Sequence, residues 1–262
     1  MNLDLKNKRA FVCGSTQGIG KAVAMELAAM GANVTLIARN EQSLKQVKSE
    51  LPVSGSQLHS YLCADFSNPA QLKELADNFI QRSGPVNILI NNTGGPPGGP
   101  IVQAKPEEFL SAFNNHLICN HLLAQACIEG MKNSNYGRIV NVISTSVKIA
   151  LPNLGVSNTI RAAVGNWSKT MANELGKFGI TVNNVLPGAT ATQRLSGIIE
   201  ARAVKTQASN DDIKKEMLHE IPLGRFADAS EVANAVAFLA SPAAAYINGI
   251  NLPVDGGRTG SL

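Results

Sequence analysis

Three glycines near the amino terminus have a spacing that suits the binding of phosphate groups. Gly14, Gly18 and Gly20 lie in the segment GSTQGIG, between an apolar stretch at 10–13 and a helical pattern at 18–30. At such a junction, backbone N–H groups and the positive end of the helix dipole can face a pyrophosphate, and glycine lets the phosphates approach the backbone. An ordinary tight turn is the competing interpretation, because this motif alone is a weak indication. Its position directly after an expected strand favours phosphate binding.

The end of the next expected strand, 33–38, bears on which dinucleotide such a turn would bind. An acidic residue there would hydrogen-bond a free ribose 2′-hydroxyl, but Ala38 has no carboxylate. Arg39 instead places a cationic fork where a 2′-phosphate would lie, and Ser15 can serve as a second donor. We therefore expect NADP(H) rather than NAD(H) as cofactor. The alternative is that Arg39 is a solvated surface residue.

Short apolar segments alternate with helical patterns along the chain. The expected strands are 10–13, 33–38, 59–63, 88–91, 138–143, 181–186 and 250–254, and the expected helices are 18–30, 41–50, 69–82, 106–132, 155–176 and 229–240. This alternation is typical of a parallel sheet with helices on both faces. The sequence therefore predicts an α/β fold, a doubly wound Rossmann-type three-layer sandwich with a seven-stranded parallel sheet. We expect a single dinucleotide-binding domain over 1–262.

The composition excludes several classes of protein. The chain has 262 residues, 44% of them hydrophobic, which suits one large domain with a sizeable core. No apolar run approaches the roughly 20 residues needed to span a bilayer, and no apolar segment of signal-peptide type precedes the first strand. We expect a cytoplasmic protein without a membrane partner.

Charge and cysteine patterns exclude further classes. The net charge is +4, but the 23 Lys and Arg residues are dispersed and aromatic residues make up only 5%, so nucleic-acid binding is not expected. The four cysteines form no CxxC pair and have no histidine cluster of zinc spacing nearby. We expect neither a disulfide framework nor a metal site.

Two segments interrupt the alternation, a Gly/Pro-rich loop at 94–100 and a polar stretch at 193–220. In a doubly wound sheet, both would lie at the carboxyl ends of strands, where ligands bind. The second segment mixes apolar with many polar residues, which suits a mobile amphipathic lid that closes over a substrate. A helical hairpin that only packs on the subunit surface is the alternative.

Further motifs stand in a fixed order after the glycine turn: Asp65, Asn91-Asn92-Thr93-Gly94, Pro187-Gly188 and Val254-Asp255-Gly256-Gly257. Over about residues 5–257, this order and spacing resemble the short-chain dehydrogenases/reductases, and within them most closely the 3-oxoacyl-acyl-carrier-protein reductases. Cys13 and Thr93 replace the threonine and alanine that are usual in the family, and both changes are small.

The resemblance implies a set of cofactor-binding residues. They are Gly14, Ser15, Gln17, Gly18, Ile19, Gly20, Arg39, Asp65, Asn91, Gly94, Pro187, Gly188, Thr190 and Thr192. Asp65 would lie near the adenine, Asn91 and Gly94 near the ribose, and Thr190 or Thr192 near the nicotinamide carboxamide. For Asn91 the alternative is an asparagine that only satisfies turn amides at the end of a strand.

The same resemblance locates the catalytic positions. In this family a serine and a tyrosine hydrogen-bond the substrate oxygen, a lysine one turn later lowers the tyrosine pKa, and an asparagine positions water. These positions correspond here to Ser144, Ser157, Arg161 and His116, and Asn115 is adjacent to the last. Three of the four residue types therefore differ from the family pattern.

These replacements change the available proton chemistry. A serine hydroxyl is much less acidic than a phenol with a pKa of about 10, so Ser157 alone is a poor proton donor. Arg161 stays charged and can stabilise negative charge, but cannot exchange protons. His116 is the residue best suited to deliver a proton if its ring reaches the carbonyl. The alternative is a histidine that is hydrogen-bonded within its own helix face.

These features predict an NADP(H)-dependent short-chain oxidoreductase that reduces a ketone or a 3-oxoacyl-type carbonyl with nonstandard catalytic residues. The alternative is a catalytically inactive NADP(H)-binding pseudoenzyme or regulatory subunit. The substrate would be a small-molecule carbonyl or an acyl thioester. The segments 221–226 and 248–257 resemble the family's carboxyl-terminal region, which commonly forms subunit contacts, so the resemblance implies a homotetramer.

Overall fold

Seven parallel strands form one sheet in the part of the chain that the computed structural model describes, residues 1–261. They are β1 (Arg9–Cys13), β2 (Asn33–Ala38), β3 (Ser60–Cys63), β4 (Ile88–Asn91), β5 (Gly137–Val142), β6 (Ile180–Pro187) and β7 (Asn251–Val254). Their spatial order is β3-β2-β1-β4-β5-β6-β7, and all neighbours are parallel. The order reverses between β1 and β4, where ligands bind in sheets of this kind. The predicted doubly wound, seven-stranded sheet is confirmed.

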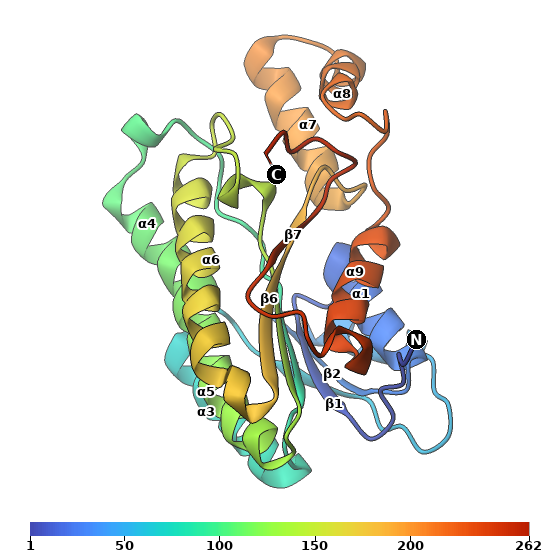
Figure 1. Cartoon of the computed structure of the whole chain (residues 1–262). Helices are drawn as coiled ribbons and strands as arrows, with labels where there is room; N and C mark the ends of the chain where they lie inside the picture. The colour runs from blue at the N-terminus through green and yellow to red at the C-terminus, as the bar shows by residue number, and fades with distance from the viewer. Residues whose placement is uncertain (262) are drawn as a thin grey trace.

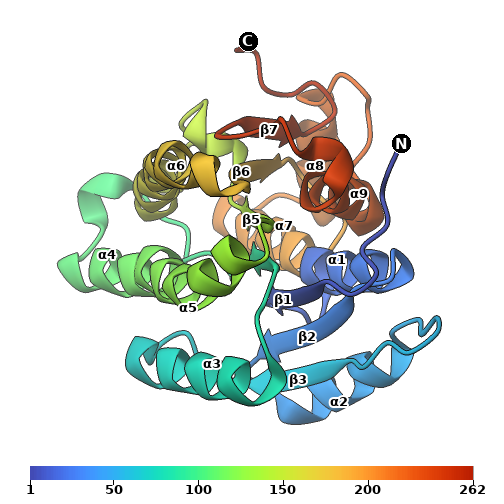
Figure 2. The ribbon, with the colours of Figure 1, turned by 60° about the horizontal axis from the view of Figure 1, so that its bottom comes forward.

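Helices cover both faces of the sheet, as Figure 2 shows. One face carries α1 (Gly18–Ala29), α2 (Glu41–Glu50) and α9 (Ala229–Ala240), and the other carries α3 (Pro69–Ser83), α5 (Cys119–Asn133) and α6 (Gly155–Leu175). In β1, Ala10 and Val12 belong to the first core, whereas Phe11 and Cys13 belong to the second. Successive side chains of a strand point to opposite faces, so a strand buried on both sides is apolar throughout.

A row of asparagines, called here the asparagine row, crosses four neighbouring strands. Asn91, Asn141, Asn184 and Asn251 are register partners on β4, β5, β6 and β7. The side-chain Nδ2 of each donates to the Oδ1 of the next, at 2.8, 3.0 and 2.8 Å. Ser168 of α6 accepts from Asn141 and donates to Asn184. These bonds offset much of the cost of burying the first three amides, while the Oδ1 of Asn91 has no partner within residues 1–261.

The carboxyl ends of the strands meet at one edge of the sheet, and α7 (Gln193–Thr206) and α8 (Asn210–His219) project beyond this edge at the top of Figure 1. Helix α4 (Pro106–Phe113) continues through a π-helical turn, η2 (Asn114–Ile118), into α5. One uninterrupted helix was predicted for 106–132. A π turn adds a residue to one helical turn, which the apolar spacing does not reveal.

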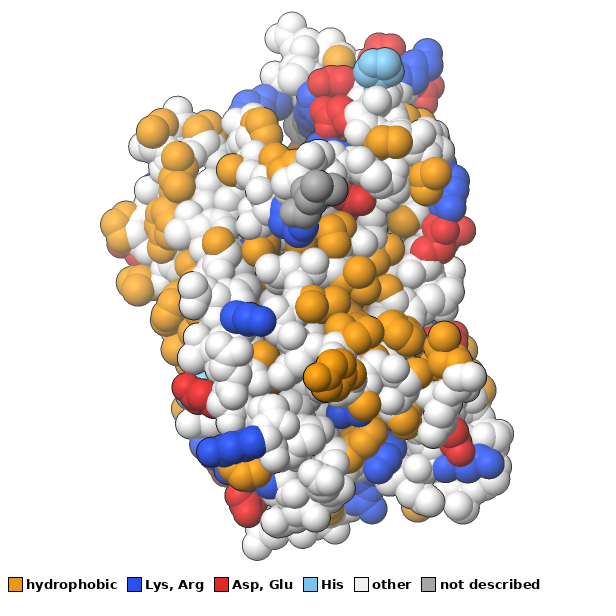
Figure 3. All heavy atoms as spheres, viewed as in Figure 1, with side chains coloured by type: hydrophobic (Ala, Val, Ile, Leu, Met, Phe, Trp, Pro, Cys, Tyr) orange, Lys and Arg blue, Asp and Glu red, His pale blue; other side chains and the backbone are white. Residues whose placement is uncertain are grey.

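Some large apolar side chains are exposed to solvent. Tyr246 is fully exposed and Leu223 is 66% exposed. Figure 3 shows hydrophobic side chains gathered on the face of the molecule that is also seen in Figure 1. Within the described residues, no helix combines the length and the apolar character needed to cross a membrane.

Candidate active site

The glycine turn between β1 and α1 adopts a conformation that only glycine fits. Gly14 and Gly18 have φ values of +58° and +54°, a region that L residues rarely adopt. A Cβ atom on Gly20 would lie 2.1 Å from the carbonyl oxygen of Gly14, and one on Gly14 would lie 2.4 Å from that of Asn92. The Asn92 side-chain amide donates to the carbonyls of Cys13 and Gly14, at 3.2 and 3.3 Å. The end of β4 therefore fixes the turn, through a residue that the sequence reasoning did not assign.

The amino end of α1 has free capacity for an anion. Gln17 precedes the helix in an extended conformation, and no side chain within residues 1–261 caps this end. The first turn carries no acidic residue either. Its N–H groups and the positive end of the helix dipole are therefore left to bind an anion beside the turn. This arrangement fits a dinucleotide pyrophosphate.

A cavity of about 520 Å³ runs along the turn. The predicted cofactor-binding residues that line it are Gly14, Gln17, Gly18, Ile19, Arg39, Asp65, Gly94 and Thr192. Asn92, Thr93, Asn115 and Arg194 also line it. The cavity thus joins the glycine turn to the end of β2 on one side and to the start of α7 on the other.

The remaining predicted cofactor residues do not line this cavity. Ser15 is fully buried, and its Oγ lies 3.5 Å from the carbonyl oxygen of Ile37, so its hydroxyl is directed into the protein. Asn91 belongs to the asparagine row, which matches the alternative interpretation of a hydrogen-bonded strand-end residue. The others are Gly20, which packs on the Gly14 carbonyl, and Pro187, Gly188 and Thr190 at the end of β6.

Opposite charges lie at the β2 end of this cavity. Asp65 accepts a hydrogen bond from the N–H of Ser67 at 2.9 Å, and this bond, with a smaller effect of Arg39, holds the pKa of the Asp65 carboxyl below its usual value. Arg39 is exposed and forms no ion pair in the described part of the chain. Its guanidinium is therefore available to a phosphate.

Three of the predicted catalytic residues lie around the end of β5. Ser144 follows the strand, and its Oγ accepts from the N–H of Ser146 at 3.1 Å. Ser157 and Arg161 are buried one turn apart on the same face of α6. Arg161 Nη1 donates to the carbonyl of Val142 at 3.0 Å. This bond docks α6 on the strand that leads to Ser144.

The fourth residue, His116, lies in the π turn with its ring almost completely buried. Its Nδ1 is 2.6 Å from the hydroxyl of Thr93. Burial, followed by the positive charges of Arg161 and Arg194, lowers the pKa of His116 to about 3. The ring is therefore neutral at pH 7, and the imidazolium form that its ordinary pKa of 6.5 would allow is not populated.

A second cavity, of about 380 Å³, adjoins the first. His116 and Ala112 line it from one side, and Pro96 and Pro97 line it from the Gly/Pro-rich loop. Gly94, Gly95 and Asn115 line both cavities. The structure therefore brings His116 and Asn115 to the junction of two cavities, one of which contains the glycine turn.

Arg194 at this junction was not predicted from the sequence. It lies in the first turn of α7, and its Nη1 donates to the carbonyl of Gly95 at 3.2 Å. A cation in the first turn of a helix is opposed by the helix dipole, which costs roughly 0.3–1 kcal/mol. That unfavourable position is the signal in the sequence that could have identified Arg194.

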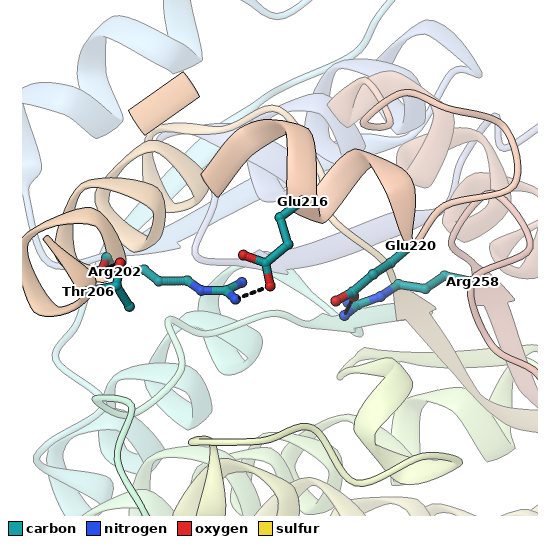
Figure 4. A network of polar contacts seen from close by, with 5 residues as sticks. All are labelled: Arg202, Thr206, Glu216, Glu220 and Arg258. Carbon is teal, nitrogen blue, oxygen red and sulfur yellow. Dashed lines mark hydrogen bonds and ion pairs between the residues drawn. The ribbon is translucent and has the colours of Figure 1, made fainter. Parts of the chain in front are cut away.

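Ion pairs hold the α7–α8 hairpin together. Arg202 of α7 pairs with Glu216 of α8 at 2.5 Å, and Glu220 pairs with Arg258 of the carboxyl-terminal segment (Figure 4). Thr206 donates to the carbonyl of Arg202 within α7. The hairpin is thus linked internally and also to the chain beyond β7.

The parallel sheet with a glycine turn at its switch point defines an α/β protein of the dinucleotide-binding class. A family profile described as "Enoyl-(Acyl carrier protein) reductase" matches residues 14–259. The chain belongs to this family, the short-chain dehydrogenases/reductases. It is 36% identical over 257 residues to the 3-oxoacyl-[acyl-carrier-protein] reductase FabG of Vibrio cholerae. The alignment covers 97% of this chain and 98% of that protein. The predicted resemblance is confirmed.

Two solved structures are similar over nearly the whole chain. L-sorbose reductase from Gluconobacter frateurii, complexed with NADPH and L-sorbose, has a TM-score of 0.93 and 27% identity, and the match covers 100% of both chains. YwfH, an NADPH-dependent reductase involved in bacilysin biosynthesis, has a TM-score of 0.91 and 28% identity, with 97% and 99% of the two chains covered.

Proposed function

We propose that the protein is an NADP(H)-dependent oxidoreductase that reduces a ketone or a 3-oxoacyl-type carbonyl with nonstandard catalytic residues. The observation that carries this proposal is the junction at Gly94 and Gly95, where the cavity of the glycine turn adjoins the cavity bordered by His116. The first cavity would hold the dinucleotide. The carbonyl of a small molecule or an acyl thioester would lie at the junction near Gly95, which the Arg161 guanidinium approaches, and the rest of the substrate would extend into the second cavity.

Arg39 supports the choice of NADP(H). Its guanidinium borders the first cavity and forms no ion pair within residues 1–261. The preceding residue, Ala38, has no carboxylate that could bind a ribose hydroxyl. A phosphate there would accept charge-assisted hydrogen bonds. The similarity to two reductases whose descriptions name NADPH agrees with this choice. Ser15 contributes no donor in this proposal, because its hydroxyl is directed into the protein.

NADPH, when bound, would supply a hydride for the carbonyl carbon. The residues of the chain act on the carbonyl oxygen. Ser144 and Ser157 hydrogen-bond this oxygen, and Arg161 stabilises the negative charge that develops on it. Burial, and then the charge of Arg194, lowers the pKa of Arg161 to about 10, so Arg161 remains charged at pH 7.

Solvent water that enters the second cavity would supply the proton in this mechanism, and the hydroxide left behind would exchange into bulk solvent. Arg161 keeps its protons at pH 7, and the pKa of about 3 leaves His116 without an imidazolium to donate from. The neutral ring of His116 instead orders groups in the second cavity by hydrogen bonding. Loss of a general acid typically slows proton transfer about 10²- to 10⁴-fold, so carbonyls that need little protonic help are the favoured substrates.

The α7–α8 hairpin, within 193–220, acts as a lid of this single domain. Its base is fixed by two backbone hydrogen bonds between 189–191 and Ala227, at 2.8 and 3.0 Å. Gln193 and Arg194 border the first cavity, so a change in the position of α7 alters access to it. The exposed side chains of Leu223 and Tyr246 support assembly with further copies of the chain, in a homotetramer.

A catalytically inactive NADP(H)-binding protein is the second candidate. Two observations favour it: Ser157 stands at the position of the family's tyrosine, and the pKa of about 3 removes His116 as a proton source at neutral pH. Such a protein would keep the cofactor cavity and the fold but would not turn over a substrate.

Both candidates are tested by NADPH oxidation with a panel of ketones, diketones and 3-oxoacyl thioesters, accompanied by NADPH-binding measurements. Turnover above the background without protein, lost in Arg161→Ala and retained in the exposed-surface control Arg82→Ala, is the result expected of a reductase. Tight NADPH binding without turnover would refute reductase activity on this panel. A gain of turnover in Ser157→Tyr/Arg161→Lys would then support the inactive protein.

A further inference from the structure

Two guanidinium groups converge on Gly95 at the junction of the cavities. A Cβ atom at Gly95 would lie 2.5 Å from Nη2 of Arg194 and 3.4 Å from Nη2 of Arg161. The other terminal nitrogen of each guanidinium, Nη1, donates a hydrogen bond to a backbone carbonyl. Arg194 Nη1 donates to Gly95, and Arg161 Nη1 donates to Val142. Neither Nη2 has a hydrogen-bond acceptor within residues 1–261. Two anchored cations therefore present free donors to the same small region.

No carboxylate compensates the charge of this pair within residues 1–261. Arg202, Arg225 and Arg258 each pair with a glutamate, whereas Arg161 and Arg194 form no ion pair in the described chain. Arg161 is only 7% exposed. Two like charges, one of them buried, disfavour each other, and an anion between them would relieve this repulsion.

The acidic residues of the second cavity do not compensate the pair. Glu107 and Glu108 lie in the first turn of α4, where they complement the positive end of that helix. Glu108 also accepts from the backbone N–H of Lys105 at 2.7 Å. Neither forms an ion pair with Arg161 or Arg194.

We infer that Arg161 and Arg194 bind a carboxylate of the substrate, so that the substrate is an oxo acid with its carboxylate next to, or one carbon away from, the carbonyl that is reduced. Guanidinium groups bind carboxylates through paired, directional hydrogen bonds. The carboxylate would lie between the two Nη2 atoms, close to Gly95, which borders both cavities. This inference rests on the proposed reductase function, because it places the anion beside the reacting carbonyl.

The other possible source of the anion is a phosphate of the cofactor. The uncapped amino end of α1 and the glycine turn already suit the pyrophosphate, and Arg39 suits a 2′-phosphate at the β2 end of the first cavity. Arg161 does not border that cavity. Arg194 borders the first cavity and Arg161 borders neither, so the two guanidinium groups meet only at Gly95, which borders both cavities. We place the anion at this junction, beyond the glycine turn and away from the β2 end, where the pyrophosphate and the 2′-phosphate would lie.

The test measures binding and turnover with matched anionic and neutral compounds. Isothermal titration calorimetry with malonate, an unreactive dicarboxylate, is performed on the NADP⁺ complex of the wild type, Arg194→Met, Arg161→Lys and the control Arg82→Ala. We expect malonate to bind roughly 10- to 100-fold more weakly to Arg194→Met, as for loss of a hydrogen-bonded charge, and unchanged to Arg82→Ala. Arg161→Lys keeps the charge but loses the planar fork, and should weaken malonate binding less than Arg194→Met.

NADPH oxidation then compares acetoacetate with methyl acetoacetate, its neutral ester. We expect wild-type kcat/KM to be at least 10-fold higher for acetoacetate, and Arg194→Met to abolish this preference. Equal turnover of both compounds would overturn the inference and leave the proposed reductase in place. Arginine-dependent malonate binding without any turnover would retain the anion site and remove the reductase function.

The cofactor alternative has its own outcome. If Arg194→Met weakens NADP⁺ binding 10-fold and leaves malonate binding unchanged, the arginine pair serves a cofactor phosphate and the inference is wrong. If NADP⁺ binding is unchanged and malonate binding is weakened, the anion belongs to the substrate. Circular dichroism of each variant establishes that it is folded.

Discussion

Replacing His116 by glutamine should remove a pH dependence from the stability of the protein. The pKa of the buried ring is about 3 in the folded protein, whereas the unfolded chain returns it to about 6.5. Below this upper value, the unfolded state binds a proton that the folded state does not. The stability associated with the neutral ring is therefore fully present above about pH 6.5 and decreases as the pH falls towards 3.

The size of the effect follows from the two pKa values. Each pH unit inside this window changes the free energy of unfolding by about 1.4 kcal/mol for one proton. From pH 7 to pH 5, the wild type should therefore lose about 2 kcal/mol that His116→Gln does not lose. Glutamine can still hydrogen-bond Thr93, but it does not titrate.

The assay is urea unfolding at pH 7, 6 and 5, followed by circular dichroism. All other groups are identical in the two proteins, so their effects cancel in the difference. His219→Gln is the matched control, because His219 is exposed at the end of α8, and it should follow the wild type. If wild type and His116→Gln lose the same free energy of unfolding between pH 7 and pH 5, the ring of His116 is not held in its neutral form. The proton chemistry that depends on the neutral ring would then be wrong.

Three further predictions test the cofactor cavity and the sheet. Arg39→Ala should weaken NADPH binding about 10-fold or more without affecting NADH, because only NADPH carries the 2′-phosphate; equal losses in fluorescence titrations would contradict this role. Gly20→Ala should abolish NADPH binding, because its Cβ would lie 2.1 Å from the carbonyl oxygen of Gly14, and an unchanged affinity would refute the rigid turn. Asn141→Ala should lower the free energy of unfolding by about 1–3 kcal/mol, since it removes the acceptor of the buried Asn91 amide, whereas Asn184 keeps its hydrogen bond from Ser168. A loss below about 1 kcal/mol in urea unfolding would contradict that energetic role.

The fold was predictable because the period of the apolar residues differs between strands and helices. Strand ends agree to about one residue: β5 was expected at 138–143 and lies at Gly137–Val142. The third strand begins one residue later than expected, because His59 turns its ring inward and accepts from the N–H of Val34 at 3.2 Å. A local hydrogen bond of this kind leaves no trace in the pattern of hydrophobicity.

The candidate site was less predictable, because its parts meet only in the folded chain. The glycine turn is contiguous in sequence and was identified directly. Arg194 and Gly95 are 99 residues apart, and no local spacing connects them. The pKa of His116 was expected near its ordinary value, but it depends on burial and on Arg161 and Arg194, which only the tertiary structure brings near.

The asparagine row also disfavours incorrect strand registers while the sheet forms during folding. Parallel strands far apart in sequence pair slowly, so incorrect alignments have time to form. Sliding β5 by one residue along β4 would place Asn141 opposite Ile90 and turn its side chain to the other face. Each amide then left without a partner inside the protein would cost roughly 1–3 kcal/mol. Only the native alignment of the strands keeps all the hydrogen bonds between the four asparagines. Sheets with a shifted strand are therefore selectively destabilised.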